Sequence, residues 1–188
     1  MSIEKLFSIL LSDNPSTELI NNEAELFELI PELKVCKGFE QKNEWHVFDV
    51  YEHILHVVDY VPNDLHLRLA ALFHDIGKPI SFFEDENGVG HFYGHWETSQ
   101  KIFDNFAKQH ELDKDFAYKV SKLIYYHDLN LHKVTNEELI NITSILGTDG
   151  ITDLYFIKKA DLLSQNSKFH YLLDDYARQE EYLQSMHH

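Results

Sequence analysis

The chain has 188 residues, of which 44% are apolar and 13% aromatic, so it is long enough to bury a hydrophobic core. Its formal net charge of −16 disfavours non-specific binding to nucleic acids or anionic membranes, although a local metal charge leaves a small anionic substrate open. Glycine (7) and proline (4) are scarce, which favours long helices and predicts an all-α protein.

Apolar residues recur at helical spacing along most of the chain. The predicted helices cover residues 3–11, 17–30, 48–60, 64–75, 96–109, 114–127, 135–146, 152–163 and 168–186. We expect one domain over residues 1–188, with a core at 35–165. The helices within 1–31 and 168–186 are expected to pack on that core.

The breaks between these helices follow from turn-forming residues. Pro31 ends the second helix, and residues 32–45 lose the helical pattern and are expected to form a loop. Residues 81–94 carry aromatic side chains on both sides of an Asn-Gly pair, which predicts a short β-hairpin or an aromatic loop. A capping box at 135–138 opens the seventh helix, and two glycines between 146 and 152 separate it from the eighth.

The adjacent residues His74 and Asp75 end an apolar helical run. Neighbours on a helix point about 100° apart, so both can reach one metal ion only where the helix ends. Gly77 is expected to let the chain leave the helix, and Pro79 to prevent its resumption, with Lys78 pointing back over the site. The alternative is a helix end at which His74 caps carbonyls and Asp75 is solvated.

Other histidines and aspartates lie at or near helix ends. His53 lies one turn after Asp49 and is either a hydrogen-bonded core residue or a ligand. Asp161 lies inside an apolar run, where a carboxylate is costly unless it is paired or metal-bound. His95 opens the fifth helix and His127 closes the sixth. Such a set can build a metal site in a helical bundle, and its mixed N and O ligands suit Mn, Fe, Co, Ni, Zn or Mg.

The ordered set resembles the HD superfamily of metal-dependent phosphohydrolases. Four segments also resemble the HD domain attached to bacterial CCA-adding tRNA nucleotidyltransferases: 46–53, 72–79, 92–95 and 160–161. The resemblance covers about residues 35–165. In that family Glu directly follows the histidine, whereas here Trp96 stands between His95 and Glu97. No nucleotidyltransferase segment is recognisable, so we expect a free-standing HD domain and do not carry over nucleotide addition to tRNA.

The resemblance implies one or two divalent metal ions, with Asp75 as the bridging ligand. The implied ligands are His53, His74, Asp75 and Asp161 for the first ion, and Asp75, His95 and His127 for the second. A metal-activated hydroxide would attack the phosphorus of a small nucleotide or cyclic phosphate. Lys78 would hold a phosphoryl oxygen or the leaving group, or be a surface lysine. His46 and Asp49 would orient the substrate or protonate the leaving oxygen.

Two structural assignments stay open at this point. Trp96 and the aromatic residues of 81–94 form either a base-stacking wall or a packed lid; these residues are Phe82, Phe83, Phe92 and Tyr93. Asp128 either supports His127 or is solvated. Two alternative functions also remain, namely a di-iron oxygenase of the HD type and a non-catalytic nucleotide-binding regulatory module.

The expected partner is a small phosphorylated substrate such as a nucleotide, and no membrane partner is expected. A single cysteine, Cys36, excludes an intrachain disulfide and fits a reducing cytoplasm. The segment 1–5 lacks the apolar core of a signal peptide, and no run approaches the roughly 20 apolar residues that cross a bilayer. His187 and His188 end the chain and are left out of the candidate ligands.

Overall fold

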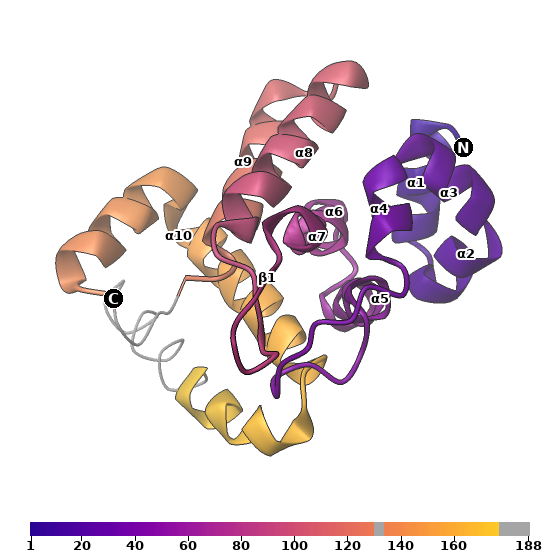
Figure 1. Cartoon of the computed structure of the whole chain (residues 1–188). Helices are drawn as coiled ribbons and strands as arrows, with labels where there is room; N and C mark the ends of the chain where they lie inside the picture. Colours follow the sequence, from indigo (N-terminus) through magenta and orange to yellow (C-terminus); the bar gives the residue numbers. More distant parts are fainter. Residues whose placement is uncertain (130–133, 177–188) are drawn as a thin grey trace.

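The computed structural model describes residues 1–129 and 134–176, and helices make up most of it (Figure 1). In chain order the elements are α1 (Ile3–Leu10), α2 (Pro15–Asn21), α3 (Glu23–Leu29), α4 (Pro31–Cys36), α5 (Val50–Tyr60), α6 (Leu65–Phe73), α7 (Lys78–Ser81), β1 (Phe83–Glu84), β2 (Gly90–His91), α8 (His95–Gln109), α9 (Lys114–Tyr126), α10 (Asn136–Leu163) and the 3₁₀ helix η1 (Ser167–Leu172). The predicted all-α class is confirmed. The segment 81–94 forms the predicted hairpin, with β1 and β2 paired antiparallel.

The N-terminal part differs from the prediction in two places. The single helix predicted over 17–30 is broken at Asn22, whose side-chain Nδ2 donates to the Glu18 carbonyl (2.8 Å) and competes with the helical hydrogen bonds. The loop predicted over 32–45 contains most of α4. Pro31 starts this helix as well as ending the previous one, because the first helical position needs no N–H.

The C-terminal part follows the prediction at α10 and departs from it at the chain's last helix. The helices predicted at 135–146 and 152–163 are confirmed as the two helical arms of α10, which begins with the predicted capping box. The arms are separated at Gly147, whose angles (φ 74°, ψ 169°) are not helical and are readily adopted by glycine. The last predicted helix, 168–186, begins as the 3₁₀ helix η1 over 168–172 and is α-helical over 173–176. Its residues 177–186 lie outside the described part of the chain.

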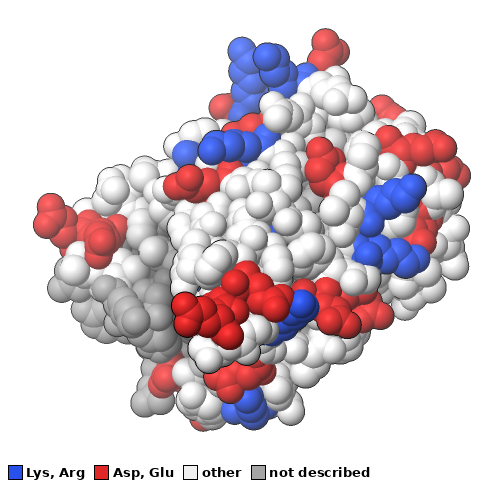
Figure 2. Space-filling model, in the orientation of Figure 1, with Lys and Arg blue, Asp and Glu red and all other residues white. Residues whose placement is uncertain are grey.

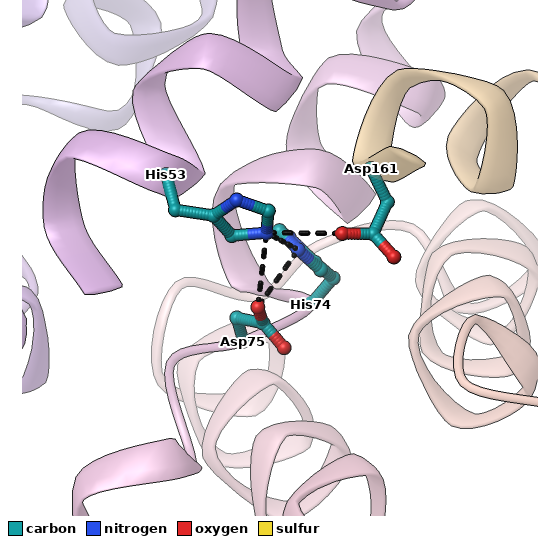
Figure 3. Close-up of side chains that lie close together, drawn as sticks. All are labelled: His53, His74, Asp75 and Asp161. Carbon is teal, nitrogen blue, oxygen red and sulfur yellow. Dashed lines mark hydrogen bonds and ion pairs between the residues drawn. The ribbon is translucent and has the colours of Figure 1, made fainter. Parts of the chain in front are cut away.

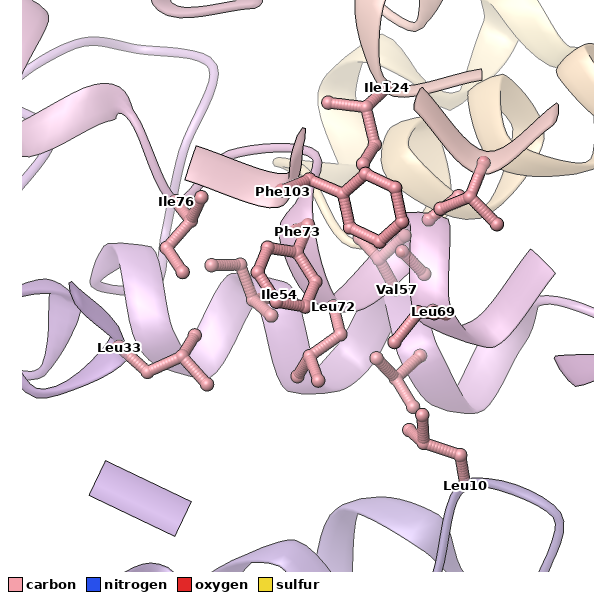
Figure 4. Packing of buried hydrophobic residues seen from close by; sticks show 14 of the residues in the cluster. Leu10, Leu33, Ile54, Val57, Leu69, Leu72, Phe73, Ile76, Phe103 and Ile124 are labelled. Carbon is pink, nitrogen blue, oxygen red and sulfur yellow. The ribbon is translucent and has the colours of Figure 1, made fainter. Parts of the chain in front are cut away.

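α6 lies at the centre of the hydrophobic core. All of its residues from Leu67 to Phe73 are buried, because it packs against α5, α8, α9 and α10 as well as α1. Both halves of the chain contribute to the core, as the side chains labelled in Figure 4 show: Leu10, Leu33, Ile54, Val57, Leu69, Leu72, Phe73, Ile76, Phe103 and Ile124. Since α6 is surrounded, the two residues that follow it, 74 and 75, are also buried.

Charged side chains are distributed over the surface. Figure 2 shows acidic and basic groups around a broad uncharged centre on one face, with no single basic patch there. Within the described ranges, no helix combines the length and the apolar character needed to cross a bilayer.

Asp153 of α10 joins three helices through charged hydrogen bonds. Its Oδ2 accepts from His66 Nε2 of α6 (2.9 Å) and from Lys119 Nζ of α9 (2.8 Å). Burial opposes ionisation of Asp153, but the hydrogen bonds from His66 and Lys119 outweigh burial and lower the pKa of this carboxyl. We expect Asp153→Asn to reduce the free energy of unfolding by about 2 kcal/mol near pH 7, measured by urea denaturation.

The pH dependence of this loss has a definite sign. The pKa of Asp153 is lower in the folded protein than in the unfolded chain, where it is about 3.9. The carboxylate therefore stabilises the fold fully at pH values above about 3.9, and this stabilisation is lost as the pH falls through the pKa of the folded protein. The difference between wild type and Asp153→Asn should therefore be constant from pH 7 to about 5 and should shrink in stronger acid. Asp149→Asn, an exposed position on the same helix, is the control. A pH-independent difference would contradict the ionic account.

Candidate metal centre

The six candidate ligands come from five helices and lie together in the interior. His53 is on α5, His74 and Asp75 follow α6, His95 is the first residue of α8, His127 follows α9, and Asp161 is on α10. Five of them are buried, and the Asp161 side chain is 23% exposed. Their ligand atoms form two groups, each within 4.8 Å, and Asp75 belongs to both.

The first group surrounds one carboxylate oxygen of Asp75 (Figure 3). Asp75 Oδ2 lies 3.2 Å from His53 Nε2 and 3.2 Å from His74 Nε2. His53 Nε2 lies 3.3 Å from His74 Nε2 and 3.0 Å from Asp161 Oδ1. Two imidazoles and two carboxylates therefore point at one small volume, which is a donor set that suits a divalent ion.

The second group surrounds the other oxygen of the same carboxylate. Asp75 Oδ1 lies 3.2 Å from His95 Nε2 and 3.4 Å from His127 Nε2, and these two nitrogens are 3.1 Å apart. Asp75 thus presents one oxygen to each group. A bridging carboxylate between two metal ions requires this arrangement.

Backbone hydrogen bonds determine which ring nitrogens face the centre. Nδ1–H groups donate to carbonyl oxygens one turn earlier in three rings: His74 to Ala71 (2.7 Å), His95 to Phe92 (2.9 Å) and His127 to Ile124 (2.6 Å). In a neutral imidazole the other nitrogen then carries a lone pair. The Nε2 lone pairs of His95 and His127 face each other at 3.1 Å, which is unfavourable unless a cation lies between them. The residues therefore fit a metal ion, and the backbone carbonyls orient them for it.

The charge of the site also suits a cation. Burial favours the neutral acid of Asp75, but electrostatic interactions with His74 and with the Lys78 ammonium outweigh burial and hold the pKa of this carboxyl well below its usual value. Burial likewise opposes ionisation of Asp161, and its hydrogen bond to His53 lowers the pKa of this carboxyl. Both carboxylates are therefore ionised at neutral pH, as metal binding requires.

Lys78 points back at the site, as expected, and all three of its ammonium N–H groups have acceptors. Lys78 Nζ lies 2.6 Å from Asp75 Oδ2, 2.7 Å from Gln41 Oε1 and 3.2 Å from His46 Nε2. His46 Nδ1 lies 2.8 Å from Asn43 Oδ1. Burial and the charge of Lys78 lower the pKa of His46 to about 2, so its ring is neutral and accepts from Lys78. Lys78 is buried and is not a surface lysine.

The structure does not bring Asp49 to the centre. Asp49 caps α5, and its two oxygens accept from the backbone N–H groups of Glu52 (2.7 Å) and Gly38 (2.8 Å). These bonds hold the carboxylate at the start of α5, and Asp49 does not line the cleft above the centre, so we assign it no contact with substrate. Asp128 is exposed at the edge of the cleft described below.

The roles expected for Gly77, to let the chain leave the helix, and for Pro79, to prevent the helix from resuming, are wrong. Gly77 has ordinary helical angles (φ −81°, ψ −10°), and α7 starts at Lys78 with Pro79 in its first turn, where a proline is tolerated. Gly77 instead allows close packing. A Cβ at this position would lie 2.6 Å from the Ser99 nitrogen and 2.7 Å from the His95 oxygen, both backbone atoms of α8.

A cleft of about 580 Å³ opens above the centre. Of the aromatic residues expected near it, three line the cleft: Phe92, Tyr93 and Trp96. Phe82 instead packs edge-on against Phe39 (ring centroids 5.3 Å apart), and Phe83 is 59% exposed on β1.

Several cleft residues were missed in the sequence, among them Trp45, Lys158, Tyr171 and Tyr176. Trp45 stacks on Phe169 of η1 at 3.6 Å, so it joins two segments that no local pattern connects. Lys158 had a readable signal, because it lies one helical turn before Asp161 in the same apolar run.

Comparisons with known proteins identify relatives of this sequence. A sequence model described as HD domain matches residues 43–164. A CC-adding tRNA nucleotidyltransferase of Thermus thermophilus is 28% identical over 169 residues, which cover 86% of this chain and 38% of that protein. An A-adding tRNA nucleotidyltransferase of Deinococcus radiodurans is 29% identical over 136 residues, covering 68% of this chain and 31% of that protein. The chain thus spans well under half the length of these relatives.

Proposed function

Because the chain belongs to the HD domain family, a superfamily of metal-dependent phosphohydrolases, we propose that it hydrolyses a phosphoester in a small nucleotide or cyclic phosphate. The HD-domain match over residues 43–164 confirms the resemblance to the HD superfamily. The observation that carries the proposal is the placement of Asp75, whose two oxygens each face a separate group of histidine Nε2 atoms.

The residues divide into those that would hold metal and those that position them. His53, His74, Asp161 and one oxygen of Asp75 would hold the first ion, and His95, His127 and the other oxygen would hold the second. Divalent ions bound there would activate water and neutralise charge on phosphoryl oxygens. Lys78 keeps the Asp75 carboxylate ionised and oriented. His46 and Gln41 hold Lys78 in that position.

The walls of the cleft support a nucleotide as the substrate. A volume of about 580 Å³ is within the range of small-molecule sites. Aromatic rings at Trp45, Trp96 and Tyr171 offer flat surfaces on which a base can stack. The relatives are named for adding nucleotides to tRNA, and we do not extend that reaction to this chain.

The test is turnover by purified protein supplied with Mn²⁺, Co²⁺, Ni²⁺ or Mg²⁺, using mononucleotides and 2′,3′-cyclic nucleotides. We expect phosphate release or ring opening with at least one metal, and a loss of about 100-fold or more in His53→Ala. His56→Ala removes an imidazole from the same helix outside both ligand groups and should behave like the wild type.

Three results would contradict the proposal or favour an alternative function. Turnover in the wild type no higher than in His53→Ala, with every metal, would contradict hydrolysis at this centre. Thermal stabilisation by a nucleotide without product would favour the regulatory alternative. An oxygen-dependent spectral change in the iron-loaded protein would favour the oxygenase.

A further inference from the structure

Lys158 is a buried lysine at the cleft whose ammonium is only partly hydrogen-bonded. It is 7% exposed and lines the cleft one helical turn before Asp161. Its Nζ donates to the carbonyl oxygen of His127 at 2.8 Å and lies 6.0 Å from the centroid of the Tyr176 ring. Among residues 1–129 and 134–176, that oxygen is the one hydrogen-bond acceptor for this ammonium, and no carboxylate there forms an ion pair with it.

The two lysines of the cleft differ in this respect. An ammonium carries three N–H donors. Lys78 uses its three on Asp75, Gln41 and His46, so it has none left for a ligand without breaking one of these bonds. Within residues 1–129 and 134–176, Lys158 uses one donor on His127 and has no acceptor for the other two. A buried cation with unused donors is costly unless a further acceptor binds to it.

The position of Lys158 would let an anion bound in the cleft accept from its remaining N–H groups. Its one hydrogen-bond acceptor in the described ranges is the backbone of His127, a candidate ligand of the second group, and its own helix carries Asp161 of the first group. Lys158 therefore stands beside both groups on the side that opens to the cleft. In a chain with a net charge of −16, an anionic substrate needs such a local positive charge.

We propose that Lys158 is the anion-anchoring residue of the cleft and that its two remaining N–H groups bind non-bridging oxygens of a phosphate group on the substrate. The inference rests on the proposed function for the nature of the substrate. It reassigns to Lys158 the phosphate contact that the sequence led us to expect at Lys78.

The test is calorimetric titration of the Mn²⁺-loaded protein with inorganic phosphate, which requires no turnover. We expect Lys158→Gln to bind phosphate about 10- to 100-fold more weakly than the wild type, the loss typical of one charge-assisted hydrogen bond. The glutamine amide can still donate to the His127 carbonyl, so the contact at the end of α9 is retained. Lys158→Arg should restore most of the affinity.

Lys159→Gln is the matched control, because it removes the same charge from the next residue, which is exposed outside the cleft. Its phosphate affinity should equal that of the wild type. Metal content and melting temperature are measured on every variant. If Lys158 serves only to cap α9, Lys158→Gln will bind phosphate normally per loaded molecule, and the proposal is overturned. Absence of phosphate binding by the loaded wild type overturns it as well, whereas absence of turnover alone bears on the proposed function.

Discussion

Asp75→Asn is expected to remove metal from both ligand groups at once and to lower phosphoester hydrolysis by about 10³-fold. The reason is geometric, because the two oxygens of this one carboxylate serve different groups. Bound metal contributes several kcal/mol to transition-state stabilisation, and each 1.36 kcal/mol is a factor of about ten in rate. Elemental analysis gives the metal content of the purified variant, and kcat/KM on the best substrate gives the loss of activity.

The comparison with single-group variants sharpens this prediction. His127→Ala should lose metal from the second group and keep it in the first, whereas Asp75→Asn should lose both. Asp104→Asn removes an exposed carboxylate on α8 and is the control. If Asp75→Asn retains as much metal as His127→Ala, Asp75 does not bridge the two groups.

Asp75→Asn also leaves the buried ammonium of Lys78 without its counter-charge. Removing one partner of a buried ion pair costs about 3–5 kcal/mol, so the variant could lose metal simply by unfolding. The double variant Asp75→Asn/Lys78→Met separates the two effects, since it removes the unpaired charge together with the ligand. We expect it to regain a cooperative urea transition and to remain without metal. Recovery of metal binding in the double variant would contradict a ligand role for Asp75.

The sequence was sufficient to locate the candidate ligands because their signal is local. A histidine and an aspartate that end a buried helix are costly there without a bound cation, and so is a carboxylate in an apolar run, such as Asp161, without a partner. The helices themselves follow from spacing and caps, and among the boundaries that failed are those where one side chain competes with the backbone, as at Asn22, and where a proline starts a helix.

Residues that act through long-range contacts could not be assigned in this way. Asp49 lies one turn from His53, yet its two oxygens accept from the backbone N–H groups of Glu52 in α5 and of Gly38 after α4. One of the three partners of Lys78, Gln41, comes from the segment 32–45, which was expected to be a loop. The number of free donors on a lysine depends on such partners, so Lys78 and Lys158 cannot be told apart by spacing alone.

The packing of Gly77 is the clearest case of a long-range constraint, and its substitution tests how the second ligand group is held. Gly147→Ala is the control, because Gly147 has a positive φ (74°) but nothing within 4 Å of the position that an added methyl group would take. Gly147→Ala should lower the free energy of unfolding by about 1–2 kcal/mol through backbone strain and leave the metal content unchanged. Gly77 has ordinary helical angles, so any cost of Gly77→Ala comes from contact with α8.

We expect Gly77→Ala to reduce the free energy of unfolding by about 3 kcal/mol and to deplete metal from the second group while sparing the first. The added methyl would lie 2.6 Å from the Ser99 nitrogen and 2.7 Å from the His95 oxygen, so the first turn of α8 must move, and His95 moves with it. Urea denaturation and metal analysis at graded Mn²⁺ concentrations measure both effects. If Gly77→Ala has reduced stability but the metal content of the wild type, the prediction is contradicted. In that case α8 shifts without displacing the His95 ring, and the hydrogen bond from His95 Nδ1 to the Phe92 carbonyl is what holds the ring.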